Sequence, residues 1–80
     1  MDKVEKQLRK MPAKDRDRVM DAMEKIILRN FSGLNLKQLT GFKSIFRVRV
    51  GNYRIIYFDN GKTIIFESVS RKNETTYNDL

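Results

Sequence analysis

The chain has 80 residues, and 17 Lys and Arg against 10 Asp and Glu give it a formal charge of +7. It contains no Cys and no His, which excludes disulfides, thiolate nucleophiles and imidazole as an acid, base or metal ligand. The length predicts one domain, residues 1–80. The excess positive charge indicates a polyanionic partner, with nucleic acid favoured over an acidic protein or a membrane surface.

The apolar residues do not predict a membrane or secreted protein. No apolar run approaches the roughly 20 residues that span a bilayer, and the charged N-terminus is not followed by the apolar stretch of a signal peptide. The acidic residues of the first half lie on the predicted solvent-exposed face of a helix, so no paired-carboxylate or metal site is expected. We therefore expect a cytoplasmic protein with no membrane contact, no metal and no other cofactor.

The first half of the chain has helical periodicity. Val4, Leu8 and Met11 lie on one face of a short helix with Asp2 as its N-cap, and Pro12 separates it from a second helix over residues 13–30. The apolar stripe of this second helix is Val19, Ala22, Met23, Ile26, Ile27 and Asn30. Two such helices form an αα-hairpin with one face free to cover a sheet.

The second half has the alternation of β-strands. Three strands are predicted over residues 45–50, 53–58 and 63–69, with two-residue turns at Gly51-Asn52 and Asn60-Gly61. Residues 34–39 form a loop or a short extra strand, and a polar tail follows from residue 70. The expected fold is therefore α+β, an αα-hairpin packed on an antiparallel sheet of three or four strands.

The turns predict which side chains share a face of the sheet. The first turn pairs Arg49 with Arg54, and the second pairs Arg54 with Glu67. The face that the helices should cover is then Phe46, Val48, Val50, Tyr53, Ile55, Tyr57, Ile64 and Phe66.

Three arginines, Arg47, Arg49 and Arg54, share the opposite face in this register. Like charges directly across a strand pair are destabilising, so the arrangement has a cost in an isolated sheet. Guanidinium groups match the geometry of phosphate, which makes a phosphate-binding surface one reading. The other reading, a solvated face in which arginine provides solubility, is equally compatible with the register.

The run LTGFKSIFRVRVGNYRIIY at residues 39–57 resembles a segment of the RelE/ParE superfamily of toxins from type II toxin–antitoxin systems. The family pattern there is L-x-G followed by [YF]-R-[LIV]-R-x-G-x-[YF]-R. The run VSRKNETTY at residues 69–77 is similar to the closing basic and Tyr-containing element of the family. With the preceding αα-hairpin, the resemblance covers nearly the whole chain and implies one RelE-like toxin domain.

A RelE-like toxin is a ribosome-dependent endoribonuclease that cuts mRNA. The resemblance implies attack of the ribose 2′-OH on the adjacent phosphate, without a metal. Two alternatives stay open: a ParE-like inhibitor of DNA gyrase, and an inactive member that only binds an antitoxin.

The resemblance also implies the site residues. The catalytic set is Arg47, Arg49, Arg54, Arg71, Lys72 and Tyr77, and the RNA-binding set is Lys43, Arg47, Arg49, Arg54 and Lys72. In these roles Arg54 stabilises the phosphorane, Arg71 or Lys72 protonates the leaving 5′-oxygen, and Tyr77 stacks on or orients the RNA. Because arginine keeps its proton, the general base is not assigned to an arginine. Lys43, Lys72 or Tyr77 serves as the base, or the site acts mainly by electrostatic stabilisation and orientation of the substrate.

The expected partners are mRNA, the ribosome and a cognate acidic antitoxin. The expected assemblies are a homodimer or a heterotetramer with the antitoxin. The family commonly begins with a β-strand, whereas this sequence begins almost in its first helix. The sheet is therefore expected to have an open edge, which a strand of a partner would cover.

Overall fold

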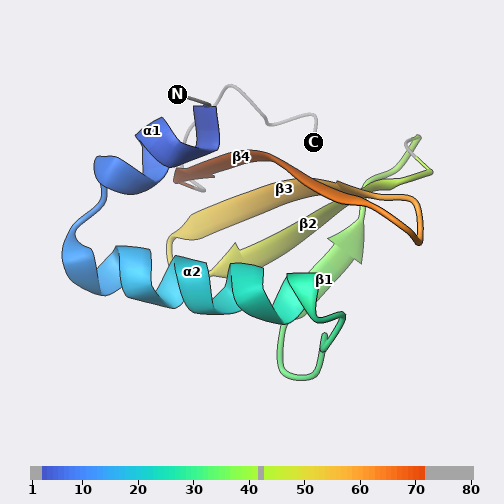
Figure 1. Ribbon diagram of the computed structural model, residues 1–80, viewed down its shortest axis with the longest axis horizontal. Helices are drawn as coiled ribbons and strands as arrows, with labels where there is room; N and C mark the ends of the chain where they lie inside the picture. The colour runs from blue at the N-terminus through green and yellow to red at the C-terminus, as the bar shows by residue number, and fades with distance from the viewer. Residues whose placement is uncertain (1–2, 42, 72–80) are drawn as a thin grey trace.

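The computed structural model describes residues 3–41 and 43–71, which form two helices and four strands (Figure 1). The elements are α1 (Lys3–Arg9), α2 (Ala13–Ile27), β1 (Asn35–Gln38), β2 (Ile45–Val50), β3 (Tyr53–Asp59) and β4 (Ile64–Arg71). Asp2, Phe42 and the tail from residue 72 onward lie outside the described residues. The strands are ordered β1-β2-β3-β4 with every neighbouring pair antiparallel, which confirms the α+β prediction in its four-stranded form.

Helix α2 ends three residues before the predicted boundary. Arg29 adopts a left-handed conformation with φ of 56° and donates its N–H to the carbonyl of Ile26, while the N–H of Asn30 reaches the carbonyl of Lys25. This pattern of bonds is a Schellman motif, which closes the last turn. The prediction that Ile27 packs in the core is wrong, because 58% of this residue is exposed.

The hairpin of β2 and β3 has the predicted register. Val50 pairs with Tyr53 and Arg49 pairs with Arg54, so Gly51-Asn52 is the two-residue turn. Gly51 has φ of 58°, a conformation that glycine adopts without steric cost. The turn therefore determines locally that the two arginines lie opposite one another.

The predicted two-residue turn at Asn60-Gly61 is wrong. Pairing between β3 and β4 begins at Asp59 and Ile64, which leaves residues 60–63 as a four-residue loop. Side-chain oxygens of Asp59 and Asn60 accept backbone N–H groups within this loop at 2.8 to 2.9 Å. These bonds stabilise the wider loop, because Asp and Asn side chains compete well for turn N–H groups.

A β-bulge in β4 changes the pairing further along the same hairpin. Consecutive residues of β3 pair with Phe66 and Ser68, so Glu67 is the extra residue of the bulge. Arg54 consequently pairs with Ser70, and the predicted pairing of Arg54 with Glu67 is wrong. Because the bulge adds one residue to β4, the apolar Val69 lies opposite Ile55. Without the extra residue, the polar Ser68 would take that position.

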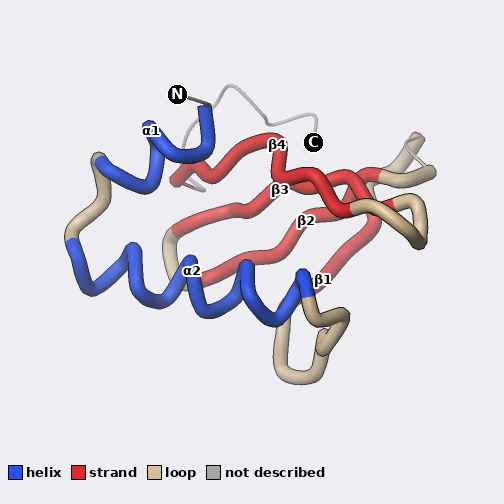
Figure 2. Tube along the Cα trace, viewed as in Figure 1, coloured by secondary structure: helices blue, strands red, loops and turns tan. Residues whose placement is uncertain are grey.

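The two helices cover one face of the sheet (Figure 2). Tyr53 and Tyr57 are buried there as predicted, and the ring of Tyr57 stacks on that of Phe46 with the centroids 5.5 Å apart. Val69 joins this face after the bulge, paired with Ile55. The buried cluster is Val4, Met11, Val19, Ala22, Ile26, Val48, Tyr53, Ile55, Tyr57 and Val69.

One edge of the sheet is covered by a helix and the other is exposed. Helix α1 packs along β4, and the side-chain oxygen of Gln7 accepts the N–H of Val69 at 2.6 Å. All four residues of β1 at the other edge are exposed. Neither helix in the described part of the chain is long and apolar enough to cross a membrane.

Candidate phosphate-binding site on the sheet

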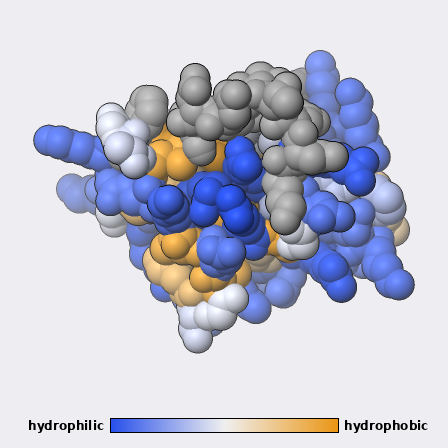
Figure 3. All heavy atoms as spheres, turned by 180° about the vertical axis from the view of Figure 1, so that it is seen from behind, coloured by the Kyte–Doolittle hydropathy of each residue, from blue (hydrophilic) through white to orange (hydrophobic). Residues whose placement is uncertain are grey.

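The sheet face that points away from the helices is called the arginine face here, after Arg47, Arg49 and Arg54. Its side chains lie in rows that run across the strands, because paired residues of neighbouring strands point to the same side. The first row is Asn35, Arg49, Arg54 and Ser70; the second is Lys37, Arg47, Ile56 and Ser68; the third is Ile45, Phe58 and Ile65. Figure 3 shows the molecule from behind, where strongly hydrophilic residues gather near the centre with apolar residues beside them.

The three arginines are close enough to influence one another. Arg49 is exposed, while Arg47 and Arg54 are half-buried. Burial lowers the pKa of Arg47, and the positive charges of Arg49 and Arg54 lower it further. The structure therefore brings these three predicted residues together as a cluster whose repulsion an anion would relieve.

Lys37 adds a fourth cation that sequence reasoning missed. It lies on β1 directly across from Arg47, so its side chain belongs to the same face. The sequence did place a loop or short strand here, but a strand of four residues has no turn signal to set its register. The pairing of β1 with β2 is what assigns Lys37 to the arginine face.

Neutral polar residues continue the first two rows onto β4. Ser70 pairs with Arg54, and Ser68 pairs with Ile56. Both serines are buried, as is Ile56. The residues directly across from Arg54 in the register are Arg49 on β2 and Ser70 on β4.

The remaining predicted site residues are placed apart from this cluster or are not described. Arg71 ends β4 and pairs with Tyr53, on the side of the sheet that the helices cover. Lys43 is exposed in the connection between β1 and β2, where its carbonyl accepts the side-chain N–H of Gln38 at 2.6 Å. Lys72 and Tyr77 lie outside the described residues.

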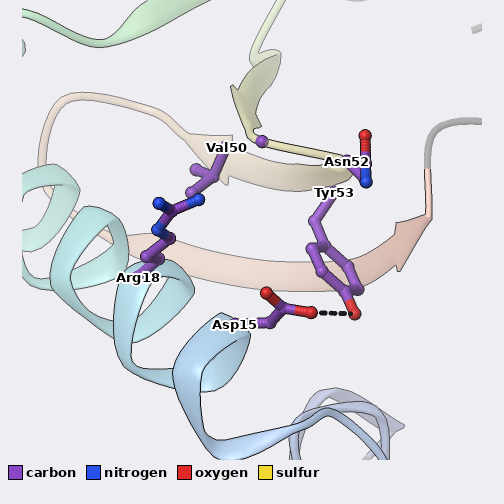
Figure 4. Close-up of a pocket in the computed structure, with 6 residues that line it drawn as sticks. Asp15, Arg18, Val50, Asn52 and Tyr53 are labelled. Carbon is purple, nitrogen blue, oxygen red and sulfur yellow. Dashed lines mark hydrogen bonds between the residues drawn. The ribbon is translucent and has the colours of Figure 1, made fainter.

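A separate pocket of about 260 Å³ lies between α2 and the turn from β2 to β3. Figure 4 shows Asp15 and Arg18 on α2 facing Tyr53 and the end of β2. The Tyr53 hydroxyl donates to a carboxylate oxygen of Asp15 at 3.1 Å. Burial and this bond to Asp15 raise the pKa of Tyr53. The bond joins α2 to the first residue of β3, next to Arg54.

No cluster of three or more acidic side chains suited to a metal ion occurs among residues 3–41 and 43–71. What the arginine face can do chemically is bind phosphate and stabilise negative charge that develops on it. Arginine keeps its charge throughout the physiological pH range and presents paired N–H donors to phosphate oxygens. These features define a small α+β protein with a cationic surface on one face of its sheet.

Comparisons with known proteins identify the family. No family model matches the chain. Over 36 residues it is 50% identical to Toxin RelE3 of Methanocaldococcus jannaschii, a match that spans 45% of this chain and only 41% of that toxin. The fold is similar to a chain in the crystal structure of the RelB-RelE antitoxin-toxin complex from Methanococcus jannaschii. That similarity has a TM-score of 0.74 and 32% identity, and covers 86% of this chain and 84% of the other. The chain therefore belongs to the RelE family of toxins from toxin–antitoxin systems.

Proposed function

We propose that the protein is a ribosome-dependent endoribonuclease that cleaves mRNA, and that a cognate antitoxin neutralises it. The observation that carries the proposal is the convergence of Arg47, Arg49 and Arg54 on one face of the sheet. Membership in the RelE family supports the same activity. A ParE-like gyrase inhibitor would not need Arg47, Arg49 and Arg54 to converge on one face at a cost in stability.

The proposed reaction is an internal transfer within RNA, without a metal. The ribose 2′-oxygen forms a bond to the adjacent phosphorus as its proton leaves, and the bond from phosphorus to the 5′-oxygen breaks. The products are a 2′,3′-cyclic phosphate and a 5′-OH whose oxygen has gained a proton. Arg49 and Arg54 stabilise the phosphorane, on which negative charge is greatest.

The proton transfers are assigned to residues that can exchange a proton. Arginine keeps its proton in proteins, and Arg71 pairs with Tyr53 on the helix-covered side. Lys72 is therefore preferred to Arg71 as the donor to the 5′-oxygen, and Tyr77 orients the RNA. Lys43 and Tyr77 are the candidates for taking the 2′-OH proton.

The test is to map mRNA ends by primer extension in a translation reaction that contains ribosomes. The wild-type protein should produce new 5′ ends, and Arg54→Ala should reduce their rate of formation about 100- to 1,000-fold, as loss of one transition-state donor does. Arg9→Ala is the matched control, because Arg9 is exposed on α1 and its loss should leave cleavage unchanged.

Two results would contradict this function. Cleavage that persists at the wild-type rate in Arg54→Ala would remove the arginine face from the reaction. Inhibition of DNA supercoiling by gyrase, with no new mRNA ends, would instead indicate a ParE-like toxin.

The proposed partner is an acidic antitoxin. The solved relative is a complex of antitoxin and toxin, and the chain's charge of +7 favours an acidic partner. Large apolar side chains are also left exposed on the helix side, on Met20, Ile27, Leu28 and Leu36. Exposed apolar side chains mark an interaction surface where they form a contiguous patch.

The pairing is tested by searching the neighbouring reading frames for a small acidic protein and co-expressing it with this chain. A stable complex should form, should lose RNA cleavage, and should be weakened about tenfold or more by Ile27→Glu. Thr63→Glu adds the same charge at an exposed loop position and should leave binding nearly unchanged. Light scattering on the free chain and on the complex measures whether they are homodimers or heterotetramers. Failure of an acidic neighbour to bind would contradict the pairing.

A further inference from the structure

Four cations form a continuous stripe across three strands of the sheet. The stripe runs from Arg54 on β3 through Arg49 and Arg47 on β2 to Lys37 on β1. Neighbouring strands are about 4.8 Å apart, and residues two apart along a strand are separated by about 6.8 Å. The stripe therefore consists of two cation pairs, Arg49 with Arg54 and Lys37 with Arg47. The midpoints of the two pairs are displaced by two residues along the strands and by one strand across them, so they lie about 8 Å apart.

The pair of Lys37 and Arg47 has unused capacity for an anion. The Nε–H of Arg47 is buried and meets no hydrogen-bond acceptor among the described residues. Lys37 is exposed and forms no ion pair with a carboxylate in the described part of the chain. A buried donor without an acceptor is costly, and burial together with its cationic neighbours also lowers the pKa of Arg47. A phosphate would supply both an acceptor and the compensating charge.

We infer that Lys37 and Arg47 form a second phosphate subsite, which binds the phosphate next to the scissile one in single-stranded RNA. The scissile phosphate lies at Arg49 and Arg54, so this inference rests on the proposed function. Six backbone bonds link successive phosphorus atoms of RNA, so an extended strand with unstacked bases places them nearly as far apart as the two pairs. The long side chains of Lys37 and Arg47 can span the remaining distance. Because phosphate contacts position a nucleic acid without reading its sequence, the subsite sets the register of the RNA on the sheet.

The first experiment measures RNA binding against salt concentration. The probe is a short single-stranded RNA that is labelled for fluorescence anisotropy and carries 2′-deoxyribose at the cleaved position. Each phosphate contact to single-stranded nucleic acid contributes a slope of about −0.7 in log affinity against log salt. Lys37→Gln should make the slope shallower by about 0.7 and raise Kd about three- to tenfold at low salt.

Matched variants and a modified RNA test the assignment to one phosphate. Lys14→Gln removes the same charge from an exposed position on α2 and should leave the slope unchanged. A neutral methylphosphonate next to the scissile position should abolish the difference between wild type and Lys37→Gln. An unchanged slope in Lys37→Gln, or a difference that survives this substitution in the RNA, would overturn the subsite.

Cleavage by Lys37→Arg separates phosphate binding from proton transfer. Arginine retains the charge, so this variant should keep the wild-type slope and kcat, whereas Lys37→Gln should raise KM about three- to tenfold at unchanged kcat. Loss of kcat in Lys37→Arg would identify Lys37 as a proton-transfer group and would overturn a purely electrostatic role.

Failure of the subsite and failure of the nuclease function give different results. Cleavage that depends on Arg54 with a binding slope independent of Lys37 would reject the subsite alone. A slope that depends on Lys37 in a protein that cleaves no mRNA would reject the nuclease function and retain the subsite as an RNA-binding surface. Both binding variants change exposed residues, and their melting temperatures should match the wild type within about 2 °C.

Discussion

The two faces of the sheet make opposite contributions to the free energy of the folded state. On the helix-covered face, Val48 pairs with Ile55, and both are fully buried with the residues of α2. On the arginine face, one residue away along each strand, Arg49 pairs with Arg54. The first arrangement lowers the free energy of the folded state by removing apolar surface from water, whereas the second raises it by repulsion.

This small protein tolerates unfavourable charge repulsion on one face of the sheet because the other face is well packed. The strands that form the arginine face are the same strands whose other sides form the core, so burial on one face holds the charges in place on the other. Tyr53 illustrates the coupling, because its hydroxyl donates to Asp15 of α2 while the next residue, Arg54, points to the arginine face. Rigid core packing is thus what preorganises the cation cluster.

The largest expected effect on stability comes from truncating the helix-covered face. Ile55→Ala should reduce the free energy of unfolding by about 3 to 4 kcal/mol, because it leaves a cavity at a fully buried position. Ile65→Ala removes the same atoms from the arginine face, where half of the residue is exposed, and should cost less than about 1 kcal/mol. Denaturant titration of both variants measures the contrast, and equal losses would contradict the division between the faces.

The second largest expected effect is a loss of stability at alkaline pH, which originates from a tyrosine on the helix-covered face. Burial raises the pKa of Tyr57 to about 12, and the charge of Asp59 adds to the increase. The unfolded chain, with an ordinary tyrosine pKa near 10, loses this proton first, so the contribution is complete below about pH 10 and disappears as the pH rises to about 12. It amounts to about 2 to 3 kcal/mol.

Thermal unfolding between pH 9 and 12 tests this tyrosine effect. Tyr57→Phe should weaken the decline in melting temperature with pH, and Tyr53 should account for part of the slope that remains, since its pKa is raised in the same direction. An identical decline in wild type and Tyr57→Phe would show that the Tyr57 hydroxyl does not contribute.

The smallest effect has the opposite sign and belongs to the arginine face. Arg49→Thr removes one member of the Arg49–Arg54 pair and introduces a residue that favours strands, so it should increase stability by about 0.5 kcal/mol at low salt. The gain should shrink in 1 M salt, where the screening length falls to about 3 Å. Lys62→Thr, which removes a charge from the loop after β3, should show no comparable gain.

Destabilisation by Arg49→Thr at low salt would contradict the claim that the arginine face lowers stability. It would mean that the arginines contribute to folding, and the solvated-face reading of the sequence would then account for them. Increased stability together with weaker RNA binding would separate the requirements of folding from those of binding.

The centre of the candidate site was predictable because it depends on local chemistry. Gly51-Asn52 forms the tight turn that its residue types favour, and alternation from that turn places Arg47, Arg49 and Arg54 on one face. The same reasoning failed at Asn60-Gly61, where the neighbouring Asp59 side chain accepts a loop N–H and the turn widens. Competing side-chain bonds of this kind are not visible in the alternation of apolar residues.

Local sequence signals were enough to predict the αα-hairpin, the central strand pair and the three arginines on one face, because helical periodicity and a glycine turn act over a few residues. Tertiary structure alone decided that β1 docks with Lys37 beside Arg47. It also decided the bulge at Glu67, which turns Val69 into the core and sets Ser70 opposite Arg54. Both outcomes depend on contacts between distant segments, such as the bond from Val69 to Gln7 across 62 residues, and no local pattern specifies such contacts.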